Sequence, residues 1–279
     1  MSELLQGVYD LHMHTSPDVV ARKCSDVELA ARWRAAGMAG GAIKSHYLDT
    51  AGRARVLTEL YPELDIAGGI TLNRSVGGNN PWAVERSAQA GARMMWFATL
   101  EARAWQAFQH RNDPVPADLS GYLTVTDENG RLFPEVLDVL DVAAKYRLTV
   151  GTGHVGAKEG LELVREGVRR GLTMVLTHCD NPADCYTKEE QIEAARMGAV
   201  IEHSFFTTFY NRTPIEQIAD EIRGEGVENV ILTTDFGQLQ SPYSDEGIEL
   251  YMRRLMEQGF SYEELLTMVR DNPRRLIHP

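Results

Sequence analysis

The sequence has no long hydrophobic run, and none of its apolar stretches approaches the roughly 20 residues that a membrane-spanning helix needs. Its first residues, Met-Ser-Glu-Leu-Leu-Gln, also lack the basic region, apolar stretch and small-residue cleavage site of an export signal. A hydrophobic content of 43% and a charged content of 24% are ordinary for a globular protein. We therefore expect a soluble, cytoplasmic protein without a membrane partner.

The chain has few cysteines, and its basic residues are fewer than its acidic ones. Cys24, Cys179 and Cys185 form an odd set without a Cys-X-X-Cys spacing, so we expect reduced thiols rather than disulfides. Cys179 directly follows His178, and packing is favoured over a role as metal ligand or nucleophile. The 28 basic and 40 acidic residues give a net charge of −12, which argues against nucleic acid as a partner. The expected partner is a small-molecule substrate, and the oligomeric state stays open, a homo-oligomer included.

The chain does contain a regular alternation of apolar strands and amphipathic helices. The predicted strands cover residues 7–14, 39–44, 65–72, 93–99, 148–152, 173–177, 199–202 and 229–234. The predicted helices cover residues 26–36, 49–60, 81–90, 134–146, 158–170, 188–197, 214–223, 245–258 and 261–269. Eight strand-helix units favour an α/β fold, the (β/α)8 TIM barrel, with residues 1–279 as a single domain. An open doubly wound sheet is the alternative, but no Gly-X-Gly-X-X-Gly follows a predicted strand.

Residues 100–132 interrupt this alternation. A helical piece around Trp105 is followed by Asp113-Pro114-Val115-Pro116 and by a predicted hairpin that joins residues 119–125 to 131–132 around Glu128-Asn129-Gly130. We interpret the segment as an insertion between the fourth strand and the fourth helix.

The first predicted strand ends in Asp10-Leu11-His12-Met13-His14. Because side chains alternate faces along a strand, His12 and His14 point the same way and can bind one metal ion together. A chance pair among the eight histidines is the alternative reading. The positions of the other histidines must decide between the two.

Most of the histidines lie where a barrel places its active site, at the carboxyl ends of the predicted strands. These residues are His12, His14, His46, His154, His178 and His203, whereas His110 and His278 lie elsewhere. A random scatter would put only about one histidine there. Asp235 ends the eighth strand, beside the first strand across the barrel closure. Such nitrogen and oxygen ligands suit zinc or another divalent metal.

The placement of His12-Met13-His14, His154, His178 and Asp235 resembles the amidohydrolase superfamily over nearly the whole chain. Stretches such as Asp10-Leu-His-Met-His-Thr-Ser-Pro-Asp18 and Thr234-Asp-Phe-Gly-Gln238 look like an uncharacterised family related to it. The resemblance implies a TIM barrel whose metal ligands are His12, His14, His154, His178 and Asp235, with one or two ions bound, zinc foremost.

The sequence departs from the better-known two-metal members of that superfamily. Those members carry a carbamylated lysine or a glutamate at the end of the fourth strand, where this chain reads Phe97-Ala98-Thr99-Leu100-Glu101. Glu101 is a candidate bridging ligand, although it lies two residues beyond the predicted strand. The number of metal ions therefore stays open.

Further candidates line the expected barrel mouth. Lys44 and His46 share one face of the second strand, and Lys44 can hold a substrate carboxylate or a developing oxyanion, ligate metal as a carbamate, or form an ion pair with Glu202 or Asp10. Arg22 and Asn73 are candidates for substrate binding, with a solvated loop position as the alternative for each. His203 is a further candidate for the substrate pocket, or for a hydrogen bond to a ligand histidine.

The leading functional hypothesis is a metal-dependent hydrolase of the amidohydrolase type. Metal-activated water would attack an amide, cyclic amide, lactone or deamination substrate, with Asp235 as general base and His178 and Lys44 as further catalytic candidates. A non-oxidative decarboxylase with a single metal is the second hypothesis, in which Lys44 or Arg22 would bind a carboxylated substrate. A non-catalytic barrel that binds metal or ligand is the third.

Overall fold

The computed structural model describes residues 3–184 and 186–278. In these residues, nine parallel strands form two sheets, one ordered β1-β2-β3 and the other β4-β5-β6-β7-β8-β9. The strands are β1 (Tyr9–His14), β2 (Gly40–Lys44), β3 (Asp65–Ala67), β4 (Gly69–Thr71), β5 (Met94–Trp96), β6 (Thr149–Gly151), β7 (Met174–Leu176), β8 (Val200–Ser204) and β9 (Val230–Thr233). An α/β fold with parallel sheets is thus confirmed.

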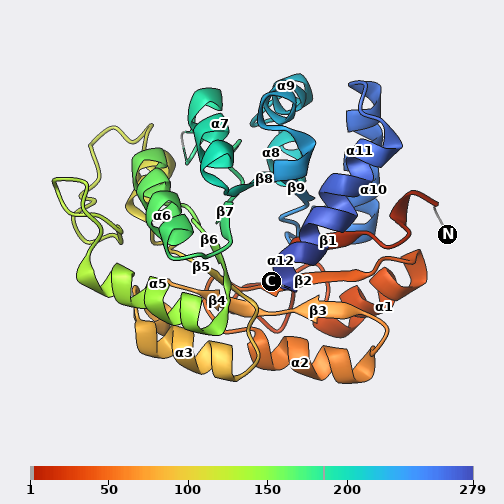
Figure 1. Ribbon diagram of the computed structural model, residues 1–279, viewed down its shortest axis with the longest axis horizontal. Helices are drawn as coiled ribbons and strands as arrows, with labels where there is room; N and C mark the ends of the chain where they lie inside the picture. Colours follow the sequence, from red (N-terminus) through yellow and green to blue (C-terminus); the bar gives the residue numbers. More distant parts are fainter. Residues whose placement is uncertain (1–2, 185, 279) are drawn as a thin grey trace.

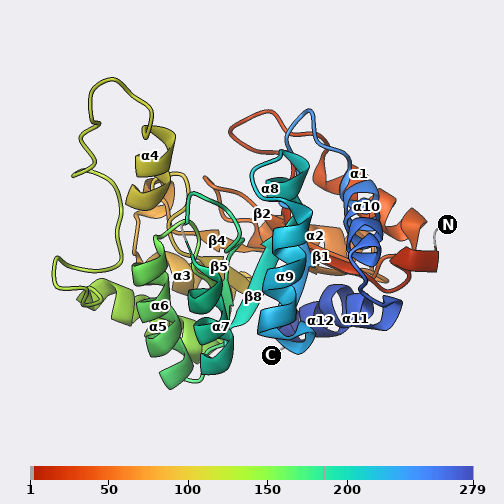
Figure 2. The same cartoon turned by 90° about the horizontal axis from the view of Figure 1, so that it is seen from above.

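The helices lie outside the strands (Figures 1 and 2). The α-helices are α1 (Asp26–Ala36), α2 (Ala51–Leu60), α3 (Pro81–Gln89), α4 (Arg103–Gln109), α5 (Pro134–Tyr146), α6 (Ala157–Arg169), α7 (Lys188–Met197), α8 (Phe205–Phe209), α9 (Ile215–Glu225), α10 (Ser244–Glu257), α11 (Tyr262–Leu266) and α12 (Asn272–Ile277). Short 3-10 turns are η1 (Glu3–Leu5), η2 (Arg74–Val76) and η3 (Val227–Asn229), and η4 (Thr267–Asp271) is a π-helix. Among the described residues, no helix is long and apolar enough to cross a membrane.

The predicted third strand is divided in two. β3 pairs with β2 and β4 pairs with β5, and the break falls at Gly68, where an added Cβ would lie 2.5 Å from the backbone oxygen of Thr50. The loop that begins α2 therefore passes directly over the strand. Backbone hydrogen bonds also connect the first strand to the segment after the last: Asp235 N donates to His12 O at 3.0 Å and His14 N donates to Phe236 O at 2.8 Å.

The two ends of the strands differ in chemistry. At the amino ends, the inward-facing residues form an apolar cluster that α12 closes with Leu276 and Ile277. Thr149 Oγ1 donates to the backbone oxygen of Leu276 at 2.6 Å, and the Asn272 side chain donates to Val230 O at 2.7 Å. Figure 2 shows α12 at one end of the molecule and α4 and α8 at the other. The carboxyl ends are therefore left for the polar residues described below.

Three local structures differ from the sequence expectations. The short helix α8 is built from Phe-Phe-Thr-Thr-Phe, a run without amphipathic period, and Phe205 stacks on Tyr251 at 4.8 Å between ring centroids. Tertiary packing therefore decides its conformation. The last predicted helix, 261–269, corresponds to α11 and the beginning of the π-helix η4, and α12 follows beyond the predicted bounds.

The third difference lies in the insertion. α4 confirms the helical piece around Trp105, but Leu123 N donates to Glu101 O at 2.8 Å and Arg103 N donates to Leu123 O at 2.8 Å. The backbone of Leu123 is thus paired with residues 101–103, and the turn at 127–131 carries a single antiparallel bridge, Thr126 with Leu132. The hairpin stays a prediction. Cys24 and Cys179 are free and buried, whereas Cys185 lies outside the described residues.

A pair of glycine substitutions tests the contact between β1 and β2. A Cβ at Gly41 would lie 2.1 Å from the backbone oxygen of Asp10, so Gly41→Ala should lower the free energy of unfolding by about 1–3 kcal/mol or more, the cost of overpacking. Gly52, in α2, has open space around its Cβ position, and Gly52→Ala should raise stability by about 0.5–1 kcal/mol through helix propensity. Denaturant titration of both variants measures this. Equal effects would refute the close contact.

Candidate metal centre

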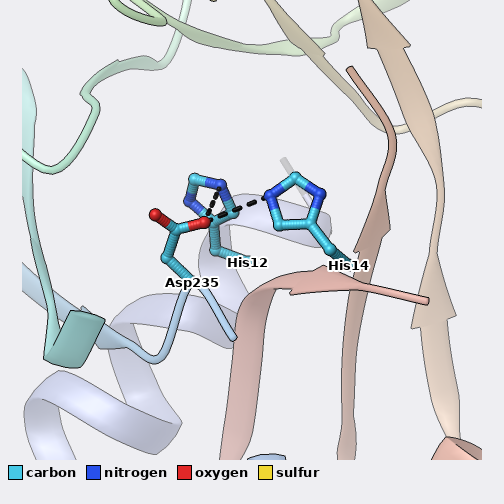
Figure 3. A group of neighbouring side chains, drawn as sticks. All are labelled: His12, His14 and Asp235. Atoms are coloured by element: carbon cyan, nitrogen blue, oxygen red, sulfur yellow. Dashed lines mark hydrogen bonds and ion pairs between the residues drawn. The ribbon is translucent and has the colours of Figure 1, made fainter. Parts of the chain in front are cut away.

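The end of β1 and the second residue after β9 bring together two imidazoles and a carboxylate (Figure 3). Oδ1 of Asp235 lies 3.2 Å from His12 Nε2 and 3.1 Å from His14 Nε2. The register of β1 against β2 shifts between Asp10 and Met13, an irregularity in the part of the strand that contains His12. Asp235 has a φ of +52°, a conformation that is uncommon outside glycine and that collects at functional sites.

Carboxylates behind the histidines fix how the rings are turned. His12 Nδ1 lies 2.6 Å from Glu202 Oε1, which also accepts a 2.7 Å hydrogen bond from the hydroxyl of Thr233. Nε2 of His12 is thereby directed toward Asp235. The Nδ1 atom of His14 is buried and has no hydrogen-bond partner among the described groups. Carboxylates that orient the ring from the far nitrogen are the usual support of metal-binding histidines.

A second group adjoins the first. Asp184 places one oxygen 3.3 Å from His154 Nδ1 and the other 2.7 Å from His178 Nδ1, and the two imidazoles stack at 4.4 Å between centroids. His178 also stacks on His12 at 5.6 Å. The Nε2 atom of His178 is buried without a hydrogen-bond partner. All five residues predicted as metal ligands therefore lie in one neighbourhood, and Asp184 joins them.

The protonation states of these groups follow from their burial and their neighbours. Burial lowers the pKa of His14 to about 3 and that of His154 to about 4, so both imidazoles are neutral and keep a lone pair for a ligand. Burial alone would raise the pKa of Asp235, but the charge of His12 and the hydrogen bond with His14 hold it well below its usual value. Burial opposes a charge on His178, but Asp184 outweighs it and raises that pKa to about 9.

Lys44 lies inside this group. Its Nζ is 2.9 Å from His12 Nε2 and 5.0 Å from the centre of the Trp96 ring. Burial lowers its pKa to about 8. Among the described residues no carboxylate oxygen lies within 4.0 Å of Nζ, so the alternative of a direct ion pair with Asp10 or Glu202 is wrong. Asp10 instead accepts hydrogen bonds from the hydroxyls of Thr234 and Ser244, at 2.6 and 2.7 Å.

Hydrogen bonds connect His46 and Asn73, two other residues predicted to line the barrel mouth. His46 stacks on His14 at 4.5 Å between centroids, and its Nδ1 lies 2.9 Å from the hydroxyl of Thr99. The Asn73 side chain donates to that same hydroxyl at 2.7 Å and to the backbone oxygen of His46 at 2.8 Å. Asn73 therefore fixes the loop that carries His46.

Arg22 is held by a carboxylate of its own loop. Its guanidinium lies 2.7 Å from Asp18 Oδ2, and Ser45 donates to the other oxygen of Asp18 at 2.8 Å. The side chain of Arg22 is only 7% exposed, so the simple solvated loop position does not apply.

The structure corrects the placement of two residues. His203 does not reach the metal group, because its Nε2 lies 2.9 Å from Glu225 and its Nδ1 lies 3.4 Å from Asp180. Side chains alternate along β8, and Glu202 rather than His203 is the residue that faces His12. Glu101 accepts a hydrogen bond from the backbone nitrogen of Arg74 and pairs with that arginine at 3.8 Å, so it does not bridge metal ions.

Sequence reasoning considered Glu202 only as an ion-pair partner of Lys44, missed its contact with His12, and missed Asp184 altogether. Glu202 could have been found from the period of two along β8, by placing the inward face one residue earlier. Asp184 lies in the loop after β7, in Cys179-Asp-Asn-Pro-Ala-Asp184, where no periodic pattern marks one residue over another.

The residues fit a divalent cation. The imidazoles of His14 and His154 are neutral, Asp235 is ionised, and Nε2 of His178 is buried without a hydrogen-bond partner among the described groups. These nitrogen and oxygen atoms are donors of the kind that zinc binds. The buried ligand atoms fall into His12, His14 and Asp235 on one side and His154, His178 and Asp184 on the other, each group within 4.8 Å.

Comparison with known proteins agrees with the fold. The model of a protein family described as "Family of unknown function (DUF6282)" matches residues 7–202. The structure is similar to an amidohydrolase from Pseudomonas aeruginosa, with 12% identity, a TM-score of 0.68, and 99% of this chain and 96% of that chain covered. It is also similar to the phosphotriesterase homology protein from Escherichia coli, with 14% identity, a TM-score of 0.63, and 98% and 99% covered.

A third similar structure is the 2,6-dihydroxybenzoate decarboxylase from Rhizobium, with 13% identity, a TM-score of 0.56, and 98% of this chain and 99% of that chain covered. No curated protein sequence matches the chain significantly. At these identities the likeness concerns the fold. The resemblance to an uncharacterised family with the amidohydrolase fold is confirmed.

Substitution of Asp184 tests whether it orients the two histidines. Asp184→Asn keeps the size of the side chain but removes the charge shared by His154 and His178, and we expect metal affinity to fall by about 10- to 100-fold. Competition with a chelator measures the affinity. Asp113→Asn is the matched control, because Asp113 pairs with His110 Nδ1 at 2.7 Å on the surface. An equal change in both variants would contradict the assignment.

Proposed function

We propose that this chain, which belongs to the family of unknown function (DUF6282), is a metal-dependent hydrolase of a small molecule. The observation that carries the proposal is the buried arrangement of His12, His14, His154, His178 and Asp235, in which Nε2 of His12 and of His14 converge on one oxygen of Asp235. Amide, cyclic amide, lactone and deamination substrates all suit it. The metal we propose is zinc, as one or two ions.

We also infer that the two sheets form one closed (β/α)8 barrel in a single domain. The backbone hydrogen bonds between β1 and the residues after β9 support this inference. So does the similarity to the amidohydrolase from Pseudomonas aeruginosa over 99% of this chain. Closure explains how the two ends of the chain can supply His12 and Asp235 to one site.

The residues of the chain divide the chemistry between them. A bound divalent cation would supply a Lewis acid that polarises the substrate and makes a water molecule more acidic. Asp235, whose pKa lies well below its usual value, is ionised at neutral pH and can accept the proton of the attacking water. His178, whose pKa of about 9 keeps it protonated at neutral pH in the metal-free protein, can donate a proton, and the charge of Asp184 holds it in position. Burial of these groups keeps competing bulk water away.

Lys44 supplies the positive charge of the site. As an ammonium 2.9 Å from His12 Nε2, it can hold a substrate carboxylate or stabilise an oxyanion. His46 and Arg22 are further substrate-binding candidates. A substrate with a carboxylate next to the scissile bond therefore matches the site.

A single-metal decarboxylase is the second candidate. Lys44 would then bind the carboxylate that is lost as carbon dioxide. The similarity of the structure to the 2,6-dihydroxybenzoate decarboxylase supports this second candidate. Release of carbon dioxide from carboxylated rings, measured beside hydrolysis of small amides and lactones, decides between the two reactions.

Substitution of Asp235 tests whether this residue takes part in the reaction or only binds the metal. Asp235→Asn keeps the size and one ligating oxygen but loses the basicity, so turnover should fall by roughly 10² to 10⁴ while most of the metal stays bound. Elemental analysis and turnover on a substrate found by screening give the two numbers. His14→Ala is the control that should lose metal and turnover together. A loss of turnover in Asp235→Asn that merely follows its metal content would make Asp235 only a ligand.

The pKa of Lys44 predicts a pH dependence for anionic substrates. Lys44 is charged below a pKa of about 8 and neutral above it, so the KM for a carboxylated substrate should rise about tenfold between pH 7 and pH 9. Lys44→Arg should flatten this profile because a guanidinium stays charged. A wild-type KM that does not change over this range would rule out Lys44 as the anion-binding group.

A further inference from the structure

A third group of ligand-type side chains lies on the opposite face of β8 from Glu202. Cys179 Sγ, a ring nitrogen of His203 and a carboxylate oxygen of Glu225 lie within 4.8 Å of one another. We call these three residues the outer group. All of them are buried: Cys179 is 1% exposed, His203 0% and Glu225 5%.

Several buried polar atoms in and around the outer group have no hydrogen-bond partner among the described groups. His203 Nε2 lies 2.9 Å from Glu225 Oε2, whereas His203 Nδ1 has no hydrogen-bond partner among the described groups, although Asp180 Oδ1 lies 3.4 Å from it. The second oxygen of Glu225 and one oxygen of Glu221 remain buried without a hydrogen-bond partner among the described groups. Ion pairing of His203 with Glu225 and Asp180 therefore does not account for every carboxylate oxygen in this region. Buried acceptors without a hydrogen bond are rare in native proteins.

Tyr251 provides an independent observation. Its side chain is fully buried, and its hydroxyl has no hydrogen-bond partner in the described part of the chain. Burial raises the pKa of this phenol, and the neighbouring charges that raise it further are those of Asp180, Cys179, Glu221 and Glu225. A hydroxyl that no protein group uses therefore lies beside the outer group.

We propose that the outer group is a second metal site, which binds one zinc-type divalent cation through Cys179, His203 and Glu225. Sulfur, nitrogen and oxygen donors together select zinc over magnesium or calcium, which prefer oxygen alone. The separation of 2.9 Å between His203 Nε2 and Glu225 Oε2 is close to the about 3.3 Å expected between two tetrahedral ligands at 2.0–2.1 Å from zinc. Small side-chain shifts therefore suffice to admit the ion.

The sequence couples this site to the central one. Cys179 follows His178, and His203 follows Glu202, and within each pair the side chains face opposite sides. A cation in the outer group would join the segment after β7 to β8 and α9. It would thereby hold the backbone that positions His178 and Glu202.

Cobalt distinguishes the two sites, because the central site has only nitrogen and oxygen ligands. The full-length protein is stripped of metal and loaded with Co²⁺ alone, and the thiolate-to-cobalt charge-transfer band in the near ultraviolet is recorded together with the metal content. We expect the band in the wild-type protein. Cys179→Ser should lose the band and about one ion per chain. Cys24→Ser, which also removes a buried free thiol, should keep both.

Two further variants keep the outcome independent of the proposed hydrolase. The double substitution His12→Ala and His14→Ala should lose the central metal and retain the band. Glu225→Gln, which preserves shape, should weaken the band even if Cys179→Ser fails to fold. A wild-type protein without the band, or a band that persists in Cys179→Ser, would overturn the proposal.

Discussion

The 2.6 Å hydrogen bond between His12 Nδ1 and Glu202 Oε1 joins β1 to β8 through the interior of the molecule. It turns the other nitrogen of His12 toward Asp235, at 3.2 Å, and toward Lys44, at 2.9 Å. Glu202 can remain a buried carboxylate because Thr233 also donates to it. An imidazole buried without such support would be free to turn, and the metal ligands would no longer share one point.

A buried carboxylate also orients the histidines on the other side of the site. Asp184 uses both oxygens to hold His154 and His178, so that one buried charge orients two rings. The site is therefore built from buried carboxylates that each hold the ring of a neighbouring histidine. Their positions depend on the apolar cluster and α12 at the opposite end, which set the strands side by side.

Much of this arrangement could be predicted from the sequence. The apolar alternation located the strands, and the position of His12, His14, His154, His178 and Asp235 at strand ends located the site, because the carboxyl ends of parallel strands meet. The sequence analysis took His203 as the residue of β8 that faces the site, but Glu202 is the one that does. A short strand contains too few residues for its alternation to show which of them face inward. Asp184 and α8 depend on contacts between distant segments, which local patterns do not encode.

The central claim is that these residues hold a metal ion at the carboxyl ends of the strands. A crystal of the zinc-loaded protein, measured on both sides of the zinc absorption edge, tests it most directly. The account predicts an anomalous peak about 2.0–2.2 Å from Nε2 of His12 and of His14 and from a carboxylate oxygen of Asp235. Zinc-loaded crystals without a peak among these three residues would contradict it.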